Sequence, residues 1–234
     1  MTLQATTPSV SVPPNTFSSF VKYTFFKLDP GWKRLQGEEC EATKRDFLSA
    51  LKKYERKFSL RTYSLVGTRA DADFMLWAVT DSLDKFQEFQ SGLVKTRLGK
   101  FLSTPYSYLA MFRPSEYFGK SSDSEPVGSR YLFVYPFTKK REWYSLPFEE
   151  RRRMMKDHVQ IGHKYSSVTI HTAYSFGLDD YEFILSFETD YPQDFLNLVM
   201  ELRSSEASKY TALETPIFTC ISTDPERMLD LLGP

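Results

Sequence analysis

The chain repeats its own pattern of aromatic, acidic and proline residues, and this repeat limits the possible folds more than any other feature. Several pairs of identical residues lie 111 positions apart: Trp32 with Trp143, Glu38 with Glu149, Tyr54 with Tyr165, Tyr63 with Tyr174, and Pro105 with Pro216. Tyr23 and Tyr135 differ by 112, and Phe74 with Phe183 and Phe86 with Phe195 differ by 109. Two copies of one structural unit therefore account for most of the 234 residues.

Each copy shows strand-like and helical patterns in the same order. β-Branched and aromatic runs predict strands, and apolar residues at helical spacing predict helices. In the first copy, strands are expected at 18–28, 60–66, 72–80 and 104–112, with helices at 38–58 and 83–97. In the second copy, strands are expected at 131–137, 168–175, 181–188 and 216–222, with helices at 147–160 and 195–210. This is the β-α-β-β-α-β order of a ferredoxin-like unit.

The two units predict an α+β fold in which duplicated ferredoxin-like halves form one antiparallel β-barrel with outer helices. Each sheet must bury an apolar face, and fusion into an eight-stranded barrel, a dimeric α+β barrel, achieves this for both. We expect a disordered leader at 1–17, the N-terminal half at 18–113, an exposed linker at 114–130, the C-terminal half at 131–223, and a tail at 224–234 that contains one short helix.

Composition excludes several classes of partner. Thirty basic and thirty acidic residues balance, which argues against nucleic acid or an anionic membrane surface as partner. The apolar runs are far shorter than the roughly 18 residues of a membrane span, and the N-terminus lacks a secretory signal pattern. Cys40 and Cys220 lie far apart and outside any Cys-x-x-Cys motif. We therefore expect two reduced, buried thiols in a cytoplasmic protein.

Histidine occurs in the second copy alone, at positions 158, 163 and 171, so imidazole chemistry is confined to that half. His158 shares a helix face with Met154 and Ile161. It is either a core histidine bonded to a carbonyl or a lone axial ligand of the kind that haem requires. A zinc site is less favoured because no second histidine or cysteine stands at ligand spacing on that helix.

The other two histidines have different settings. His163 stands near the end of the predicted helix, where a cation compensates the exposed carbonyls, so a structural role is expected. His171 alternates with Ile170 along a predicted strand, so one of the two faces the core. The sequence leaves open which one does.

A tyrosine and a basic cluster meet where the first strand of the second copy ends. Tyr135 is followed by Pro136 and then by Lys139, Lys140 and Arg141. One interpretation is a half-buried tyrosine beside a solvated basic loop. The other is a cluster that binds carboxylates next to a phenol able to give up an electron or a proton.

These residues occur in longer motifs that resemble a known family. The runs YPFTKKREWYSLPFEERRRMMKDH, GHKY and SFGLDDYEFILSFETD resemble the chlorite dismutase superfamily, and within it the coproheme decarboxylase branch of actinobacterial type. The resemblance spans most of the chain and is strongest from Tyr131 to Phe218. It implies a haem protein that is commonly homopentameric.

The resemblance implies roles for five residues around a porphyrin. His158, 15 residues after Trp143, matches the axial ligand of the haem iron, and Trp143 itself matches a porphyrin contact. Lys139 matches a basic residue that binds a propionate, and Ser208 a serine that contacts the porphyrin. Glu206 is similar in place to a glutamate that hydrogen-bonds the ligating histidine and makes it more basic.

The resemblance also implies a reaction. The substrate is iron-coproporphyrin III (coproheme), the oxidant is hydrogen peroxide, and the product is haem b. Tyr135 matches the tyrosine that is oxidised to a radical, takes hydrogen from the β-carbon of a propionate and so releases CO₂. Two propionates react in this way.

One position departs from the chlorite dismutases. Their distal arginine lies 13 residues after the axial histidine, which corresponds here to His171 or, with a one-residue shift, to Ile170. Neither is arginine, which disfavours chlorite dismutation. The linker GKSSDSEPVGSR also lacks the distal histidine of the actinobacterial type, so His171 is a hypothetical base for peroxide. The alternatives are a chlorite dismutase-like or peroxidase-like haem protein, and a non-catalytic haem-binding barrel.

Overall fold

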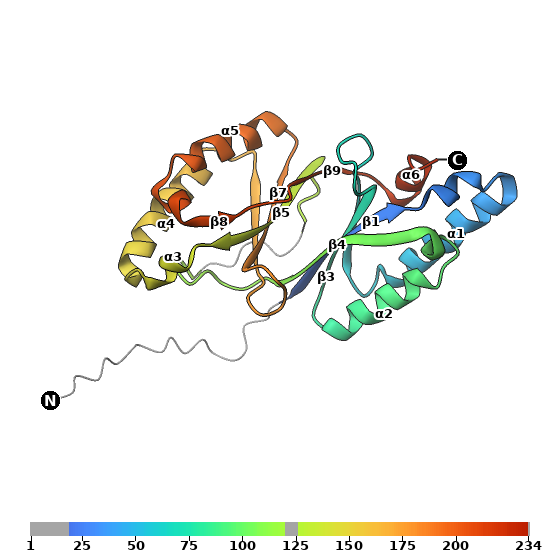
Figure 1. Cartoon of the computed structure of the whole chain (residues 1–234), viewed down its shortest axis with the longest axis horizontal. Helices are drawn as coiled ribbons and strands as arrows, with labels where there is room; N and C mark the ends of the chain where they lie inside the picture. The colour runs from blue at the N-terminus through green and yellow to red at the C-terminus, as the bar shows by residue number, and fades with distance from the viewer. Residues whose placement is uncertain (1–18, 120–125, 234) are drawn as a thin grey trace.

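The strands of both copies join one antiparallel sheet that closes into a ring (Figure 1). The computed structural model describes residues 19–119 and 126–233, so the predicted leader at 1–17 lies outside the described residues. Around the ring the order is β7-β6-β4-β1-β3-β2-β9-β5, and pairing of β5 with β7 completes it. The predicted α+β barrel with outer helices is therefore confirmed.

The first copy supplies four strands and two α-helices, with a 3₁₀ turn after β1 and another before β4. Its elements are β1 (Phe20–Leu28), α1 (Gly37–Tyr54), β2 (Ser59–Ser64), β3 (Phe74–Thr80), α2 (Leu83–Val94) and β4 (Leu102–Met111). The 3₁₀ turns are η1 (Pro30–Arg34) and η2 (Leu98–Phe101). These strands lie in the spatial order β4-β1-β3-β2, as a ferredoxin-like unit requires.

The second copy repeats this arrangement with additions. Its elements are β5 (Tyr131–Lys139), α3 (Arg141–Ser145), α4 (Phe148–His163), β6 (Thr169–Tyr174), β7 (Phe183–Thr189), α5 (Pro192–Arg203), η3 (Glu206–Tyr210), β8 (Thr211–Leu213), β9 (Phe218–Ser222) and α6 (Pro225–Asp230). The spatial order β9-β5-β7-β6 matches that of the first copy. Short α3 and β8 were not predicted, because five and three residues carry too little periodicity to be recognised.

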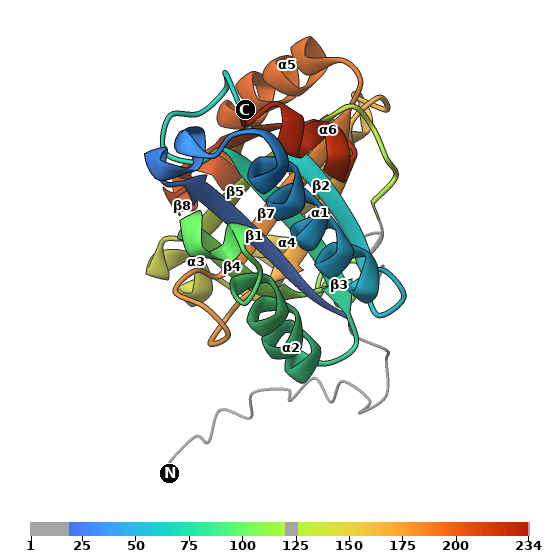
Figure 2. The same ribbon diagram turned by 90° about the vertical axis from the view of Figure 1, so that its right-hand side faces the viewer.

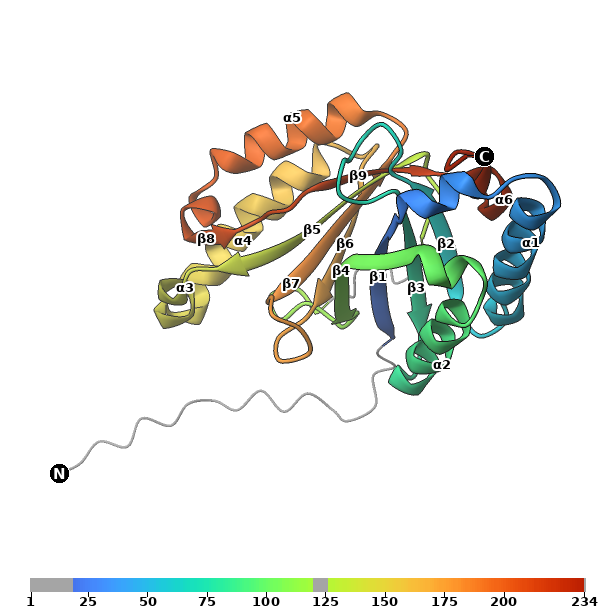
Figure 3. The same ribbon diagram turned by 45° about the vertical axis from the view of Figure 1, so that its right-hand side comes forward.

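Each strand has one face in the barrel interior and one face under helices. On β5, Leu132 and Val134 belong to the interior cluster, whereas Phe133 and Tyr135 belong to a cluster with α5 residues such as Leu198. This alternation follows from the two-residue period of a strand. Helices α1, α2 and α6 cover the first copy's outer face, and α4 and α5 cover the second copy's (Figures 2 and 3).

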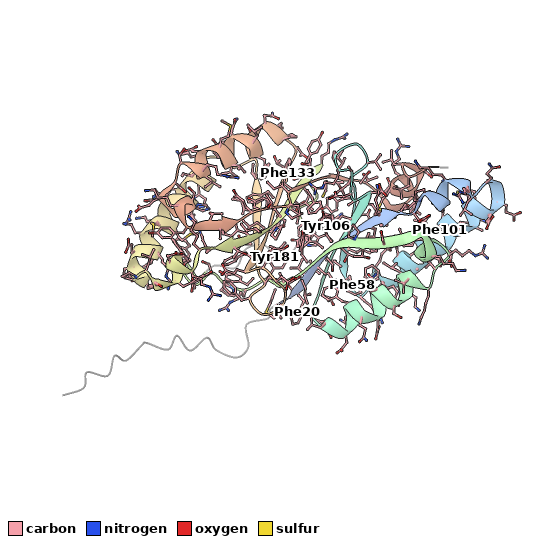
Figure 4. The ribbon with its side chains drawn as sticks, viewed as in Figure 1. Phe20, Phe58, Phe101, Tyr106, Phe133 and Tyr181 are labelled. Atoms are coloured by element: carbon pink, nitrogen blue, oxygen red, sulfur yellow. The ribbon has the colours of Figure 1, made fainter. Side chains whose placement is uncertain are left out.

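Aromatic side chains fill the barrel interior. Phe25 of β1 stacks on Phe218 of β9 with ring centroids 4.0 Å apart, and Tyr23 lies 5.4 Å from Trp77. Figure 4 shows Tyr106 and Tyr181 in the middle of the molecule, between the two groups of helices. A flat ligand therefore has to be sought on a helix-covered face rather than inside the barrel.

Strand pairing corrects one match between the copies. Phe26 pairs with Phe74 in the first copy, and Phe137 pairs with Phe183 in the second. By this register the counterpart of Tyr135 is Thr24 rather than Tyr23. Since a one-residue shift moves a side chain to the other face, Tyr23 lies inside the barrel and Tyr135 lies under the helices.

Two smaller findings concern the thiols and the helices. Cys40 and Cys220 are both buried and form no disulfide within the described residues. No helix in the described part of the chain is long and apolar enough to span a membrane.

We predict that Phe218→Ala lowers the free energy of unfolding by about 3–5 kcal/mol, the usual cost of a large cavity in a core. The Phe218 ring is fully buried and joins the two copies through Phe25. Chemical denaturation measures the change. Val94→Ala, at a residue of α2 that is 52% exposed, serves as control and is expected to change it by about 0.5 kcal/mol or less. Equal effects of the two substitutions would contradict the assigned interior packing.

Candidate functional site

Tyr135 lies on the helix-covered face of the second copy. Its ring stacks on Phe187 of β7 with centroids 5.6 Å apart and planes inclined by 13°, and the residue is 6% exposed. Burial raises the pKa of the phenol above its ordinary value; nearby Glu214 raises it further, and Arg203 opposes this. The phenol therefore keeps its proton at neutral pH.

Lys139 ends the same strand and points into the fold. Its Nζ donates a hydrogen bond to the carbonyl oxygen of Ala207 at 3.0 Å and lies 4.6 Å from the centroid of the Trp143 ring. Burial lowers the pKa of this ammonium to about 8, although Glu182 and Glu214 act in the opposite direction. At neutral pH Lys139 remains mostly cationic, which suits it to bind a carboxylate.

His158 lies on α4 with a buried ring nitrogen. Within the described residues, its Nδ1 has no hydrogen-bond partner. Burial, together with the smaller effect of the nearby Lys139 charge, lowers the pKa of the imidazole to about 4. At neutral pH the ring is therefore uncharged and carries a nitrogen lone pair that can bind a metal.

The first copy has no such imidazole. Helix α1 begins at Gly37 and α4 at Phe148, so the counterpart of His158 is Phe47. Phe47 is fully buried and packs edge-on against Phe74, with centroids 6.1 Å apart. A phenyl group closes the first copy's core at the position where the second copy carries a potential ligand.

Two predicted porphyrin-site residues, Glu206 and Ser208, bond elsewhere. The carboxylate of Glu206 accepts a hydrogen bond from Arg153 at 2.9 Å on the surface. The hydroxyl of Ser208 donates to the carbonyl oxygen of Arg203 at 2.7 Å. Between them, Ala207 packs with Trp143, so the residue of η3 that faces the core carries no carboxylate for His158.

The strand β6 separates His171 from the other candidates. His171 is fully buried in the barrel interior, where its Nε2 lies 2.9 Å from Oε1 of Glu188 and its ring meets Trp77 edge-on at 5.2 Å. Ile170 faces the other way, toward Gly162 of α4. The choice left open by the sequence is thus resolved, and Ile170 occupies the helix-covered side. His163 is the exposed last residue of α4.

Sequence reasoning missed three residues beside this group. Glu182 accepts the backbone N–H of Lys139 at 2.7 Å, and Arg203 and Glu214 form an ion pair whose charges act on Tyr135. Glu182 could have been found from the repeat, because it corresponds to Asp73 by the separation of 109. Arg203 and Glu214 are brought together by the fold and have no sequence signal.

The fold and this group of side chains define a duplicated ferredoxin-like barrel with one polar site on the outer face of its second copy. Residues 40–223 match the sequence profile described as chlorite dismutase. The chain therefore belongs to the chlorite dismutase family, a family of haem proteins.

Individual relatives agree with this assignment. The chain is 35% identical over 214 residues to a coproheme decarboxylase of Mycolicibacterium smegmatis, covering 88% of this chain and 90% of that protein. It resembles the chlorite dismutase of Candidatus Nitrospira defluvii in complex with imidazole, with 26% identity, a TM-score of 0.84 and coverage of 91% and 94%. A haem-binding protein of Thermus thermophilus matches with 25% identity, a TM-score of 0.82 and coverage of 95% and 99%.

The side chains present fit an iron porphyrin that carries carboxylates. The uncharged imidazole of His158, whose buried Nδ1 has no hydrogen-bond partner in the described part of the chain, suits an axial ligand of iron. The ammonium of Lys139 suits a propionate, and Trp143 beside it offers a flat apolar surface.

We predict that Lys139→Met raises the pKa of His158 from about 4, because removal of a nearby cation favours the protonated imidazole. The pKa should stay below 6.5, because burial is the larger cause of the shift. Titration of histidine ring carbons by NMR measures the change. Lys140→Met, at the exposed neighbouring position, is the control and should leave the pKa of His158 unchanged. An unchanged value in Lys139→Met would show that the two groups do not interact.

Proposed function

We propose that this protein is a peroxide-dependent coproheme decarboxylase that converts iron-coproporphyrin III to haem b. The observation that carries the proposal is the placement of Tyr135 and Lys139 on one strand, with the uncharged imidazole of His158 close to Lys139. The similarity to a coproheme decarboxylase over 88% of the chain supports it. The proposed site comprises His158, Tyr135, Lys139 and Trp143.

His158 and Lys139 would bind the substrate. His158 would hold the iron through a ring nitrogen, and Lys139 would pair with a propionate as a charge-assisted contact. The bound iron porphyrin supplies the reaction with peroxide, a two-electron oxidation. Burial of Tyr135 and Lys139 excludes water from the reacting side chains and strengthens the ion pair with a propionate.

Tyr135 would carry out the step at the propionate. The phenol gives up one electron and its proton, and the resulting tyrosyl radical takes a hydrogen atom from the β-carbon. Loss of one more electron and of CO₂ leaves a vinyl group. For each propionate, one peroxide and one proton are consumed, and one CO₂ and two waters are formed. Two propionates react, so two peroxides are required.

Ile170 weighs against chlorite as the substrate. It stands on the helix-covered side of β6, where its side chain offers no hydrogen-bond donor to a chlorine oxyanion. We leave His171 out of the proposed catalytic group because it lies on the opposite face of the sheet, bonded to Glu188. Glu206 and Ser208 are left out because their side chains bond Arg153 and the backbone.

We also propose that the protein works as a homo-oligomer in the cytoplasm. We further propose the domain division predicted from the sequence, with an N-terminal half at 18–113 and a C-terminal half at 131–223. Buried thiols at Cys40 and Cys220 suit a reducing compartment. Leu196 and Met200, one turn apart on α5, are 56% and 64% exposed and form an apolar strip that association would cover.

We predict that light scattering after size-exclusion chromatography gives a mass several times that of the 27.3 kDa chain. The pentamer expected from the family resemblance would be five chains. A mass equal to one chain at micromolar concentration would reject the oligomer and leave the decarboxylase proposal untouched.

We predict that Tyr135→Phe abolishes peroxide-driven decarboxylation while coproheme binding is retained, because the substitution removes the hydroxyl and keeps the ring stacked on Phe187. Peroxide is titrated into the coproheme complex, and products are separated by chromatography. Tyr131→Phe, four residues earlier on the same strand face, is the matched control and should retain turnover. Haem b formation by Tyr135→Phe at the rate of the unaltered protein would exclude the proposed radical.

A further inference from the structure

Both copies have the same carboxylate–backbone hydrogen bond at the end of their first strand. The acidic residue that precedes the third strand of the copy accepts the backbone N–H of a residue at the end of the first strand. In the first copy, Leu28 N donates to Asp73 Oδ2 at 2.8 Å; in the second, Lys139 N donates to Glu182 Oε2 at 2.7 Å. We call each of these arrangements a carboxylate clasp. The two clasps occupy equivalent positions, since they follow the paired residues Phe26 with Phe74 and Phe137 with Phe183.

The two clasps differ in their second partner. In the first copy, the other oxygen of Asp73 accepts the ammonium of Lys27 at 2.7 Å, so the carboxylate is neutralised by an ion pair. In the second copy, Glu182 Oε2 also accepts the hydroxyl of Tyr144 of α3 at 2.6 Å. An uncharged hydroxyl therefore takes the place of the ammonium.

The ammonium of Lys139 itself has no carboxylate in contact among the described residues. Its Nζ donates to the carbonyl oxygen of Ala207 and lies over the Trp143 ring, and it makes no ion pair among residues 19–119 and 126–233. A lysine ammonium has three N–H donors. One is used by Ala207, so positive charge and donor capacity remain for a ligand.

Glu182 supplies a carboxylate that could neutralise the Lys139 ammonium. Glu182 bonds the backbone of the same residue and is the largest electrostatic influence that favours its charged form. The bond from Tyr144 directs this carboxylate to the backbone amide and to α3. Phe176 packs edge-on against Tyr144 at 6.1 Å and holds its ring in place.

We propose that Tyr144 and Glu182 are positioning residues for Lys139: the Tyr144 hydroxyl keeps the Glu182 carboxylate on the Lys139 backbone N–H, so that the Lys139 ammonium stays available to a carboxylate of the substrate. The proposal rests on the proposed function in one respect, that Lys139 binds a substrate carboxylate. It adds two residues that act through Lys139 on how strongly a carboxylated porphyrin binds.

The test begins with Tyr144→Phe, which removes one oxygen atom and keeps the ring against Phe176. Release of the Glu182 carboxylate lets it pair with Lys139 Nζ, so we expect the Kd for iron-coproporphyrin III to rise about tenfold, the effect of one lost charge-assisted hydrogen bond. Adding Glu182→Gln should restore tight binding, because glutamine keeps the acceptor for the backbone N–H without the charge. Soret titration measures the Kd of each variant.

The first copy offers a matched control. The hydroxyl of Tyr106 donates to Asp71 Oδ2 at 2.6 Å, so Tyr106→Phe removes an equivalent tyrosine–carboxylate bond far from Lys139 in sequence. It should leave the Kd unchanged. Unaltered binding by Tyr144→Phe, or weak binding that Glu182→Gln fails to restore, overturns the proposal and leaves Tyr144 as a link between α3 and the loop before β7.

A structural measurement separates this inference from the proposed function. Crystal structures of porphyrin-free Tyr144→Phe should show Glu182 within about 4 Å of Lys139 Nζ, a typical ion-pair distance; a carboxylate that stays in its original position overturns the inference even if the protein binds no porphyrin. Should Tyr144→Phe fail to fold, Glu182→Gln alone decides. Binding as tight as in the unaltered protein, or tighter, supports the inference, and weaker binding overturns it.

Discussion

Closure of the antiparallel ring is the constraint on which the rest of the structure depends. Because β5 pairs with both β7 and β9, neither of its edges is open, and its side chains must alternate between two separate environments. The interior environment is filled by aromatic rings from both copies. Any site for a flat ligand is therefore confined to a face between sheet and helices. Tyr135 and Lys139 are on that face because of their odd-numbered positions on β5.

The sequence was sufficient for the scaffold, and it indicated side chains of the candidate site whose roles remain predictions. The repeat at 111 residues predicted two β-α-β-β-α-β units and one barrel, because a duplicated pattern of turns and strands leaves few ways to pack. Helical spacing placed His158 on an apolar helix face, and Tyr135 and Lys139 were recognised at a strand end. What sequence could not decide was which face of β6 carried His171. A one-residue uncertainty in register exchanges the faces of a strand, and strand pairing was needed to place Ile170 under α4.

Electrostatics was the part least accessible from sequence. The sequence does not distinguish the three residues of the basic run, Lys139, Lys140 and Arg141. In the structure Lys139 is buried, whereas Lys140 and Arg141 are exposed. Burial lowers the pKa of Lys139 to about 8 and keeps His158 uncharged at neutral pH. Neither property follows from the residue type. The partner of the Glu206 carboxylate also depends on the fold. Its position in the sequence suggested a partner for His158, but the turn η3 directs it to Arg153 and turns Ala207 inward. Side-chain direction within a short turn depends on the backbone and not on spacing alone.

The few strand pairs that join the two copies have a consequence for how such a protein can change during evolution. In the described residues β4 pairs with β6 at Met111 and Tyr174, and β2 pairs with β9 at two positions. The interior cluster contains side chains from both copies, whereas each helix-covered strand face packs its own cluster. Mutations in the interior must be compatible with both copies at once. Substitutions under the helices of one copy act mainly on that copy's cluster, so Phe47 can serve as packing in the first copy while His158 stands at the equivalent position of the second. Duplication thus allows one copy to contribute packing and stability while equivalent positions of the other copy carry the residues of the candidate site.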